Sequence, residues 1–257
     1  MKIATWNVNS LRAREDLVLD WVEREDPDIF CMQETKLVDQ EFPEDAFGDL
    51  DYDVEFLGQR AYNGVAVATH EVMTKVEKNL PDDGPKAERR LLAATVQGIR
   101  VVNIYLPNGQ DLDSDKFTFK LAWMDRLIAY LTERHDPTQP LVLCGDFNLC
   151  PEDRDAWDGE ARSGGIFMSA PERERFQRLL DWGLTDAFRA KHPDAPRPYT
   201  WWDYRAGGWE RDRGLRIDHF LVTRPILERM QDVVIHRAMR AEEGPSDHVP
   251  LTLHLED

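Results

Sequence analysis

The chain has 257 residues with 42% hydrophobic and 10% aromatic side chains, which suits one folded domain over residues 1–257 and excludes a disordered chain. No stretch approaches the ~18 consecutive apolar residues of a membrane span, and the first residues show no secretory-signal pattern. The formal net charge of −17 argues against a nucleic-acid partner, unless metal neutralises clustered carboxylates or basic side chains gather on one face around a site.

Predicted strands and helices alternate along the chain. After a strand at 3–10, apolar residues at helical spacing predict a helix over 10–25 that stops before Pro27. The same spacing predicts helices over about 115–135 and over 171–183. This alternation indicates an α/β or α+β fold with helices covering the sheets. The further strands are predicted at 28–35, 64–70, 91–97, 99–107, 140–148, 214–223 and 249–256.

The three cysteines, Cys31, Cys144 and Cys150, have neither the spacing of a zinc site nor the density of a disulfide framework. Cys31 and Cys144 lie within apolar runs and are predicted to be small buried side chains. This use of cysteine predicts a reducing, cytoplasmic environment.

Polar side chains stand where the predicted strands end. A single Asn or Asp at a strand end is usually a turn residue. The same chemistry at several strand ends is instead typical of a site built on a rigid sheet. The residues are Asn7, Glu34, Tyr105, Asn108, Asp146, Asn148, Asp218, Asp247 and His248.

These groups suit the hydrolysis of a phosphodiester, which needs a hard cation, a base for water and donors for the developing charge. Mg²⁺ prefers oxygen ligands and needs only one or two carboxylates, which Glu34 and Asp247 can supply with the Asn7 amide oxygen. Asp146 and Asn148 are two residues apart and are expected to share one side of a strand. One of them can activate the water while the other holds the water or the phosphate through its amide.

The other polar groups at the strand ends are expected to act on the phosphate. Tyr105 can donate a hydrogen bond to it or, if its pKa is lowered, transfer protons. Because neighbouring strand residues face opposite sides, Asp247 is poorly placed to orient the ring of His248. Asp218, on another strand, is the better partner, although it could instead form a salt bridge with Arg213 or Arg216.

The segment 197–216 is expected to recognise the substrate. Its arginines suit phosphates, and its aromatic rings suit exposed bases or a sugar without its base. Trp202 is expected to pack in the core, and 84–90 and Arg162 are as well explained by solvated charge as by DNA contact. The alternating residues are Arg197, Tyr199, Trp201, Trp202, Tyr204, Arg205, Trp209, Arg211, Arg213 and Arg216.

The motifs "ATWNVNSLRAR", "CMQETK", "NIYLPNG", "GDFN", "YTWWDYR", "RGLRID" and "SDHVP" resemble the exonuclease III-type apurinic/apyrimidinic endonucleases over essentially the whole chain. The resemblance implies a four-layered α/β sandwich of two packed mixed β-sheets flanked by helices. It also implies Mg²⁺- or Mn²⁺-dependent cleavage of duplex DNA 5′ to abasic sites, with 3′→5′ exonuclease and 3′-end-cleaning activity. The partner is then double-stranded DNA with abasic sites or 3′ ends, and a monomer suffices.

The resemblance implies roles for residues that match the motifs. Metal ligation falls to Asn7, Glu34 and Asp247, with Asp146 and Asn148 as candidates for a second site. Catalysis falls to Tyr105, Asp146, Asn148, Asp218 and His248. DNA contact falls to Asn108, Trp201, Arg205, Arg211, Arg213 and Arg216, with Trp201 lining the pocket for the abasic sugar. Two other hypotheses remain open, namely a phosphoesterase for small phosphoesters and a non-catalytic DNA-binding protein on the same fold.

Overall fold

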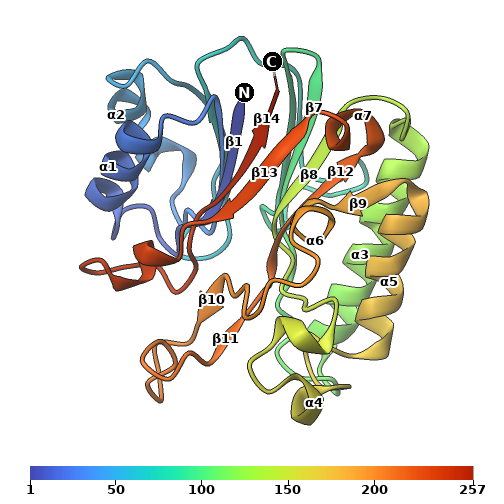
Figure 1. Ribbon diagram of the computed structural model, residues 1–257. Coiled ribbons are helices and arrows are strands. Elements are labelled where there is room, and N and C mark those ends of the chain that lie inside the picture. Colours follow the sequence, from blue (N-terminus) through green and yellow to red (C-terminus); the bar gives the residue numbers. More distant parts are fainter. Residues whose placement is uncertain (257) are drawn as a thin grey trace.

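Two β-sheets lie face to face between two layers of helices in the computed structural model, which describes residues 1–256 (Figure 1). One six-stranded sheet has the order β13-β14-β1-β2-β4-β3, and the other has the order β5-β6-β7-β8-β12-β9. Both sheets are mixed, because β1 and β2 run parallel, as do β7 and β8, whereas their other neighbours are antiparallel. The predicted four-layered α/β sandwich is confirmed.

The strands of the first sheet are β1 (Lys2–Asn7), β2 (Ile29–Gln33), β3 (Asp53–Leu57), β4 (Val65–Thr69), β13 (Met230–Ile235) and β14 (Leu251–Leu255). Those of the second are β5 (Thr74–Lys78), β6 (Leu91–Val96), β7 (Ile99–Tyr105), β8 (Leu141–Asp146), β9 (Leu184–Asp186) and β12 (Asp218–Thr223). A separate hairpin pairs β10 (Trp201–Trp202) with β11 (Gly214–Leu215).

The helices are α1 (Glu15–Glu25), α2 (Glu44–Gly48), α3 (Asp115–Arg134), α4 (Gly159–Arg162), α5 (Ala170–Trp182), α6 (Ala187–Lys191) and α7 (Arg224–Leu227). Short 3₁₀ turns occupy η1 (Asp39–Glu41), η2 (Asp153–Asp155) and η3 (Arg237–Ala241). None of the helices in residues 1–256 combines the length and hydropathy that a membrane crossing requires.

Apolar side chains fill three layers of core, because the central strands are buried on both faces. In β8, Val142 and Cys144 face the other sheet, whereas Leu141 and Leu143 face α3 and α5. The first sheet packs its outer face on α1 and α2. A strand covered on both sides reads as a continuous apolar run, which explains why the sequence showed β8 so clearly.

A buried polar bridge joins the two sheets beneath the edge that carries the site. Gln33 at the end of β2 donates from Nε2 to Oδ1 of Asn103 in β7 at 2.7 Å, and both side chains are fully buried. Asn103 in turn donates to the carbonyl oxygens of Met32 and Ala66, at 2.9 Å each. Buried amides with several partners allow few alternatives, so the bridge fixes how the two sheets are aligned.

Helix α1 begins later than the predicted Ser10. The backbone N–H of Ser10 donates to the Glu34 carbonyl at 2.7 Å, and that of Leu11 donates to Thr35 at 3.1 Å. Ser10 has a φ of 89°, outside the helical region. Tertiary pairing with the loop after β2 therefore delays the helix to Glu15.

The predicted strand 214–223 is also divided, into β11 and β12. The strands β3, β5, β9, β10 and β13 were not predicted. Most of these are short or lie at the edge of a sheet, where partial exposure weakens the apolar pattern.

Candidate active site

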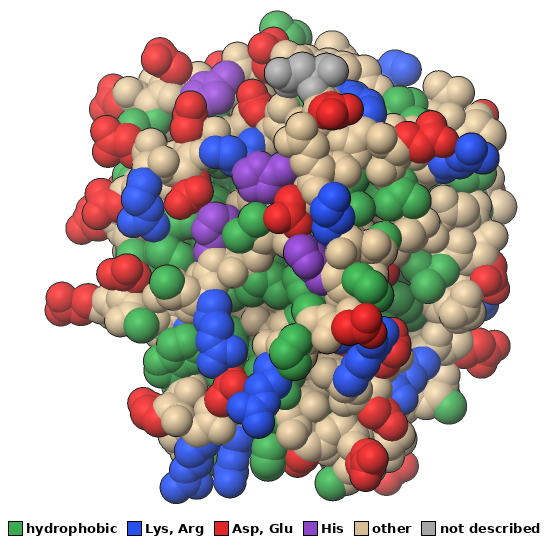
Figure 2. Space-filling model, in the orientation of Figure 1, with side chains coloured by type: hydrophobic (Ala, Val, Ile, Leu, Met, Phe, Trp, Pro, Cys, Tyr) green, Lys and Arg blue, Asp and Glu red, His purple; other side chains and the backbone are tan. Residues whose placement is uncertain are grey.

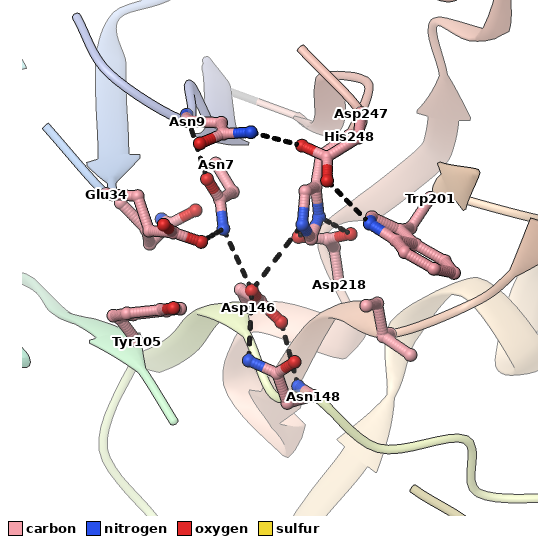
Figure 3. A network of polar contacts seen from close by, with 12 residues as sticks. Asn7, Asn9, Glu34, Tyr105, Asp146, Asn148, Trp201, Asp218, Asp247 and His248 are labelled. Atoms are coloured by element: carbon pink, nitrogen blue, oxygen red, sulfur yellow. Dashed lines mark hydrogen bonds and ion pairs between the residues drawn. The ribbon is translucent and has the colours of Figure 1, made fainter. Parts of the chain in front are cut away.

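The polar side chains that end the predicted strands meet at one edge of the sandwich, between the two sheets (Figure 3). Asp146 lies at the centre of this group and comes from the end of β8. Tyr105 and Trp201 lie on opposite sides of it in Figure 3. The two sheets thus bring together residues that are up to 241 positions apart, from Asn7 to His248.

Asn148 is held against Asp146 by a tight turn rather than by a continuing strand. It has a φ of 46°, and its backbone N–H donates to Oδ1 of Asp146 at 2.8 Å. Its side-chain Nδ2 donates to Oδ2 of Asp146 at 3.2 Å and to the Leu106 carbonyl at 3.0 Å. The expected proximity of the two residues is found, but the turn creates it, because β8 ends at Asp146.

His248 faces Asp218 and not its neighbour in sequence. Its Nδ1 lies 2.9 Å from Oδ2 and 3.1 Å from Oδ1 of Asp218, the first residue of β12. Its Nε2 lies 3.7 Å from Oδ2 of Asp146. Residues 247–249 precede β14 and pair with 200–202, so the ring orientation comes from these contacts and not from strand alternation.

Burial and charge move the pKa values of this pair away from their ordinary range. Burial raises the pKa of Asp146 to about 7, against the attraction of His248 and helped by repulsion from Asp218 and Glu34. Burial also disfavours a charged His248, but the carboxylates of Asp218 and Asp146 outweigh it and raise its pKa to about 10. The imidazole is therefore protonated at neutral pH and can donate from Nε2.

Glu34 stands next to Asp146 and is joined to it by Asn7. Nδ2 of Asn7 donates to Oε1 of Glu34 at 2.8 Å and to Oδ2 of Asp146 at 2.9 Å. Oδ1 of Asn7 accepts from the Asn9 backbone at 3.0 Å, so Asn7 presents its nitrogen to the carboxylates. The amide oxygen of Asn7 faces the Asn9 backbone in this arrangement, and its place beside the metal stays a prediction.

Three side chains can converge on a cation. One ligand atom each from Glu34, Asp146 and His248 lie within 4.8 Å of one another. The protonated imidazole makes His248 a donor and not a ligand, which leaves two carboxylates. Two carboxylates with space for water suit a hard divalent cation such as Mg²⁺ or Mn²⁺.

Asp247 lies outside that group and is engaged elsewhere. Its Oδ1 accepts from Nδ2 of Asn9 at 2.8 Å, and its Oδ2 accepts from Nε1 of Trp201 at 2.9 Å. Although burial alone would raise it, the charge of His248 and these hydrogen bonds lower the pKa of Asp247. Asp247 holds Trp201 in this arrangement, and its role on the metal side stays a prediction.

Tyr105 faces the carboxylates with a protonated phenol. Burial and the negative charges of Glu34 and Asp146 raise its pKa well above the ordinary value. The Arg90 guanidinium lies 4.7 Å from the ring centroid. Of the two roles left open for Tyr105, a hydrogen-bond donor to phosphate fits this environment.

An aromatic depression of about 180 Å³ opens beside Trp201. Arg213 lies 4.6 Å and Arg162 lies 5.5 Å from the Trp157 ring, so two guanidinium groups flank one apolar wall. Arg205 lines the same depression, and Arg211 is exposed on the same loop. Trp202 is fully buried, as predicted. The lining includes Trp157, Arg162, Phe167, Trp201, Arg205 and Arg213.

The prediction that Arg216 contacts DNA is wrong. Its side chain is 1% exposed, and it donates to both oxygens of Asp155, at 2.8 and 3.0 Å. A second carboxylate, that of Asp186, lies 2.8 Å from Nη1. His219, expected to be structural, accepts from the same guanidinium at 3.1 Å. Burial and these contacts hold the Arg216 guanidinium inside the protein, where a phosphate of DNA cannot reach it.

A second depression of about 480 Å³ lies on the Tyr105 side. Its lining includes Arg90, Lys116 and Asn108, whose Nδ2 donates to Oδ1 of Asn148 at 3.0 Å. Lys and Arg side chains gather over the β10–β11 hairpin in the lower part of the molecule (Figure 2). Positive charge therefore borders the carboxylates on both sides despite the net charge of −17.

Sequence reasoning missed several residues that organise the site. Lys36 lies 2.9 Å from Oε2 of Glu34 and also bonds Oδ1 of Asn9. Asn9 stands two positions after Asn7 in "NVN", and Lys36 stands two positions after Glu34 in "ETK". This spacing from a predicted site residue was the available signal. Arg90 ends the segment 84–90, for which DNA contact and solvated charge were equally good explanations, and the buried Lys120 gave no signal.

Comparison with known proteins identifies the family and agrees with the fold. The model of the Endonuclease/Exonuclease/phosphatase family matches residues 4–248. The chain is 36% identical over 262 residues to exodeoxyribonuclease III of Haemophilus influenzae, covering 98% of each chain. It is 33% identical over 258 residues to an exodeoxyribonuclease of Bacillus subtilis, again covering 98% of each.

Solved structures give the same result. The 3′-5′ exonuclease NExo of Neisseria meningitidis superposes with a TM-score of 0.95 at 42% identity, covering 100% of both chains. An AP endonuclease from Archaeoglobus fulgidus gives 0.95 at 40% identity with the same coverage. A further structure shows 3′ phosphatase NExo bound to a product DNA hairpin. The sequence and fold together show that this chain belongs to the endonuclease/exonuclease/phosphatase family and, within it, to the exonuclease III-type nucleases.

Proposed function

We propose that this protein is a DNA-repair nuclease that hydrolyses phosphodiesters in duplex DNA, with Mg²⁺ as its metal and Mn²⁺ as a substitute. It cleaves the phosphodiester 5′ to an abasic site and also acts on blocked or ordinary 3′ ends. The observation that carries the proposal is the convergence of Asp146, Asn148 and the Asp218–His248 pair beside Glu34. Related proteins named exodeoxyribonuclease III and AP endonuclease support it.

Glu34 and Asp146 would hold the divalent cation, which supplies charge neutralisation at the phosphate. Asp146 accepts the proton of the attacking water through Oδ2, which faces His248 and Asn7. Asn148 keeps the Asp146 carboxylate in place through its backbone and side-chain donors. These contacts fix the base before substrate arrives, which is the condition for efficient general-base catalysis.

His248 donates from Nε2 to the charge that develops on the phosphate, while Asp218 fixes its Nδ1. The phenol of Tyr105 supplies a second donor from the opposite side. Trp201, Arg205 and Arg213, which line one depression, would receive a sugar or nucleotide, and Asn108, which lines the other, would receive a phosphate. Both depressions have basic borders, which suits a polyanion better than a small phosphoester.

A single incision assay tests the proposal. A labelled duplex with one abasic site is incubated with protein and Mg²⁺, then with Mn²⁺, and then with chelator. We expect incision 5′ to the site with either metal and none with chelator. Binding without incision would leave the non-catalytic hypothesis, and hydrolysis of an inositol phosphate in preference to DNA would favour a small-phosphoester enzyme.

The same proposal covers organisation and location. We propose one catalytic domain acting as a monomer, because each group of the site comes from this chain. We also propose a cytoplasmic location, supported by three free and buried cysteines. Light scattering of the purified protein measures the first point directly.

A further inference from the structure

A completely buried ion pair lies beneath the site, between the two helices that cover the second sheet. Nζ of Lys120 in α3 lies 2.5 Å from Oε1 of Glu172 in α5, and both side chains are 0% exposed. Neither residue touches the proposed reacting atoms. Burying two charges is costly, and an apolar pair of similar volume is often at least as stable. The pair therefore calls for an explanation beyond stability.

The ammonium group of Lys120 binds the backbone of two loops that carry site residues. It donates to the carbonyl of Asn148 at 2.7 Å and to the carbonyl of Asn108 at 3.3 Å. The side chains of these two asparagines are themselves joined, at 3.0 Å. The buried ammonium group thus binds the backbone carbonyls of both asparagines, while their side-chain amides face the site.

The carboxylate of Glu172 organises a third loop. It accepts from the backbone N–H of Phe167 at 3.2 Å, and from the N–H and hydroxyl of Ser169 at 3.0 and 2.6 Å. The carbonyl of Phe167 accepts from Cys150 at 2.8 Å, which ties this loop to the Asn148 turn. Phe167 lines the aromatic depression, and its ring lies 5.0 Å from Nζ of Lys120.

Both loops held by Lys120 contain left-handed backbone, which glycine adopts freely but which Asn148 adopts at a cost. Asn148 has a φ of 46° and Gly109 a φ of 89°. A Cβ on Gly109 would lie 3.0 Å from Cδ of Lys120, so the loop packs closely on the lysine. Burial lowers the pKa of Lys120, and the Glu172 carboxylate opposes that shift and helps the ammonium group stay charged. Left-handed backbone persists where surrounding contacts fix it.

We propose that the Lys120–Glu172 pair is a positioning element for the nuclease reaction, which holds Asn108, Asn148 and Phe167 in the arrangement that receives the substrate. This proposal rests on the proposed function. Its role is to fix loops around the scissile phosphate, and it transfers no proton. Small displacements of groups that position a substrate cost about 10²-fold in rate.

The test compares wild type with Lys120→Met and with the double variant Lys120→Met/Glu172→Gln. The double variant leaves no unpaired buried charge and keeps an acceptor for the helix cap, so its stability should recover toward wild type. The turnover number kcat, measured well below the melting temperature, should still fall about 10- to 100-fold. In an Asn148→Ala background the double variant should cause a smaller further loss than in wild type, because the part of its effect that acts through Asn148 is already lost while the parts through Asn108 and Phe167 remain.

A matched control is Arg100→Met/Glu77→Gln, which removes an ion pair of 2.6 Å at the far end of β7. It should lower the melting temperature without changing kcat. A double variant with wild-type kcat, or losses that multiply with Asn148→Ala, would overturn the proposal.

Amide hydrogen exchange keeps the proposal testable without turnover. Asn148 and Cys150 donate to Asp146 and Phe167, so their amides should be protected in wild type and should exchange faster in the double variant. If wild type cleaves no DNA, the proposed function fails. Unchanged exchange in that case would also reject the loop-holding role, whereas faster exchange would support it.

Discussion

His248 and Asp218 form a buried pair in which Nδ1 of the imidazole lies 2.9 Å from the carboxylate, while Asp247, next to His248 in the chain, bonds Trp201. The pair joins the first residue of β12 to the segment before β14. Because a carboxylate on Nδ1 fixes the ring and favours its charged form, Nε2 becomes a directed donor toward Asp146 and the phosphate.

The first prediction concerns this pair. His248→Ala and Asp218→Ala should each lower kcat for abasic-site incision by about 10²- to 10³-fold. The double variant should lose little more, because residues that act as a unit fail together. Surface His192 also pairs with an aspartate, Asp232, at 2.6 Å, and His192→Ala serves as the control with unchanged kcat. If the fold losses in kcat of the two single variants multiply in the double variant, the two residues act independently and the pairing is contradicted.

Asp146→Asn should remove the base. The amide keeps the shape but accepts no proton, so incision should fall by about 10²- to 10⁴-fold while duplex binding remains. Single-turnover incision and fluorescence anisotropy measure the two effects. The exposed Asp136→Asn is the control. Incision within a few-fold of wild type would exclude Asp146 as the base.

The pH dependence of incision should be bell-shaped. Asp146 must be ionised, so activity rises as pH passes about 7. His248 must be protonated, so activity falls as pH passes about 10. These apparent values belong to the coupled pair. Raising the concentration of divalent cation should move the acidic limb to lower pH, because positive charge favours the carboxylate. In Asp218→Asn, the alkaline limb should move to lower pH; an unmoved limb would contradict the assignment to His248.

Metal binding separates the two carboxylates assigned to the metal by sequence. Glu34→Gln should weaken Mn²⁺ binding about 10-fold or more, since it removes a charged ligand. Asp247→Asn should leave Mn²⁺ affinity close to wild type, because both oxygens of Asp247 are bonded to Asn9 and Trp201. Isothermal titration with Mn²⁺ alone gives both constants. If Asp247→Asn lowers Mn²⁺ affinity as much as Glu34→Gln does, Asp247 is a metal ligand.

Two arginines of the same segment should behave oppositely. Arg205→Ala should weaken duplex binding and reduce the slope of log affinity against log salt by about 1, with unchanged stability. Arg216→Met should leave the salt slope unchanged but lower the free energy of unfolding by about 3–5 kcal/mol, because Asp186 and Asp155 lose a buried cation and only Asp155 keeps another, Arg189. If Arg216→Met changes the slope of log affinity against log salt, Arg216 contacts DNA after all.

Local patterns predicted those parts of the fold whose signal lies within a short stretch of chain. Helices α3 and α5 were found because apolar spacing and caps are local, and β8 because a doubly buried strand is wholly apolar. The start of α1 was misplaced because Ser10 bonds the Glu34 loop, a contact between segments 24 residues apart. Edge strands such as β3 and β13 carry too little apolar pattern to stand out.

By itself, the sequence determined the chemistry of this protein: a set of carboxylates, amides and a histidine at strand ends, and motifs that resemble one family. Residue type and strand position are local properties, so they can be read from the sequence alone. Only the tertiary structure decided how most groups pair. The pairing of Asp218 with His248 was predicted from the sequence, but the bond of Asp247 to Trp201, the core position of Arg216 and the support that Lys120 gives the asparagines were not. Those partners come from different elements, and burial between two sheets and their helices selects them through contacts that no spacing along the chain encodes.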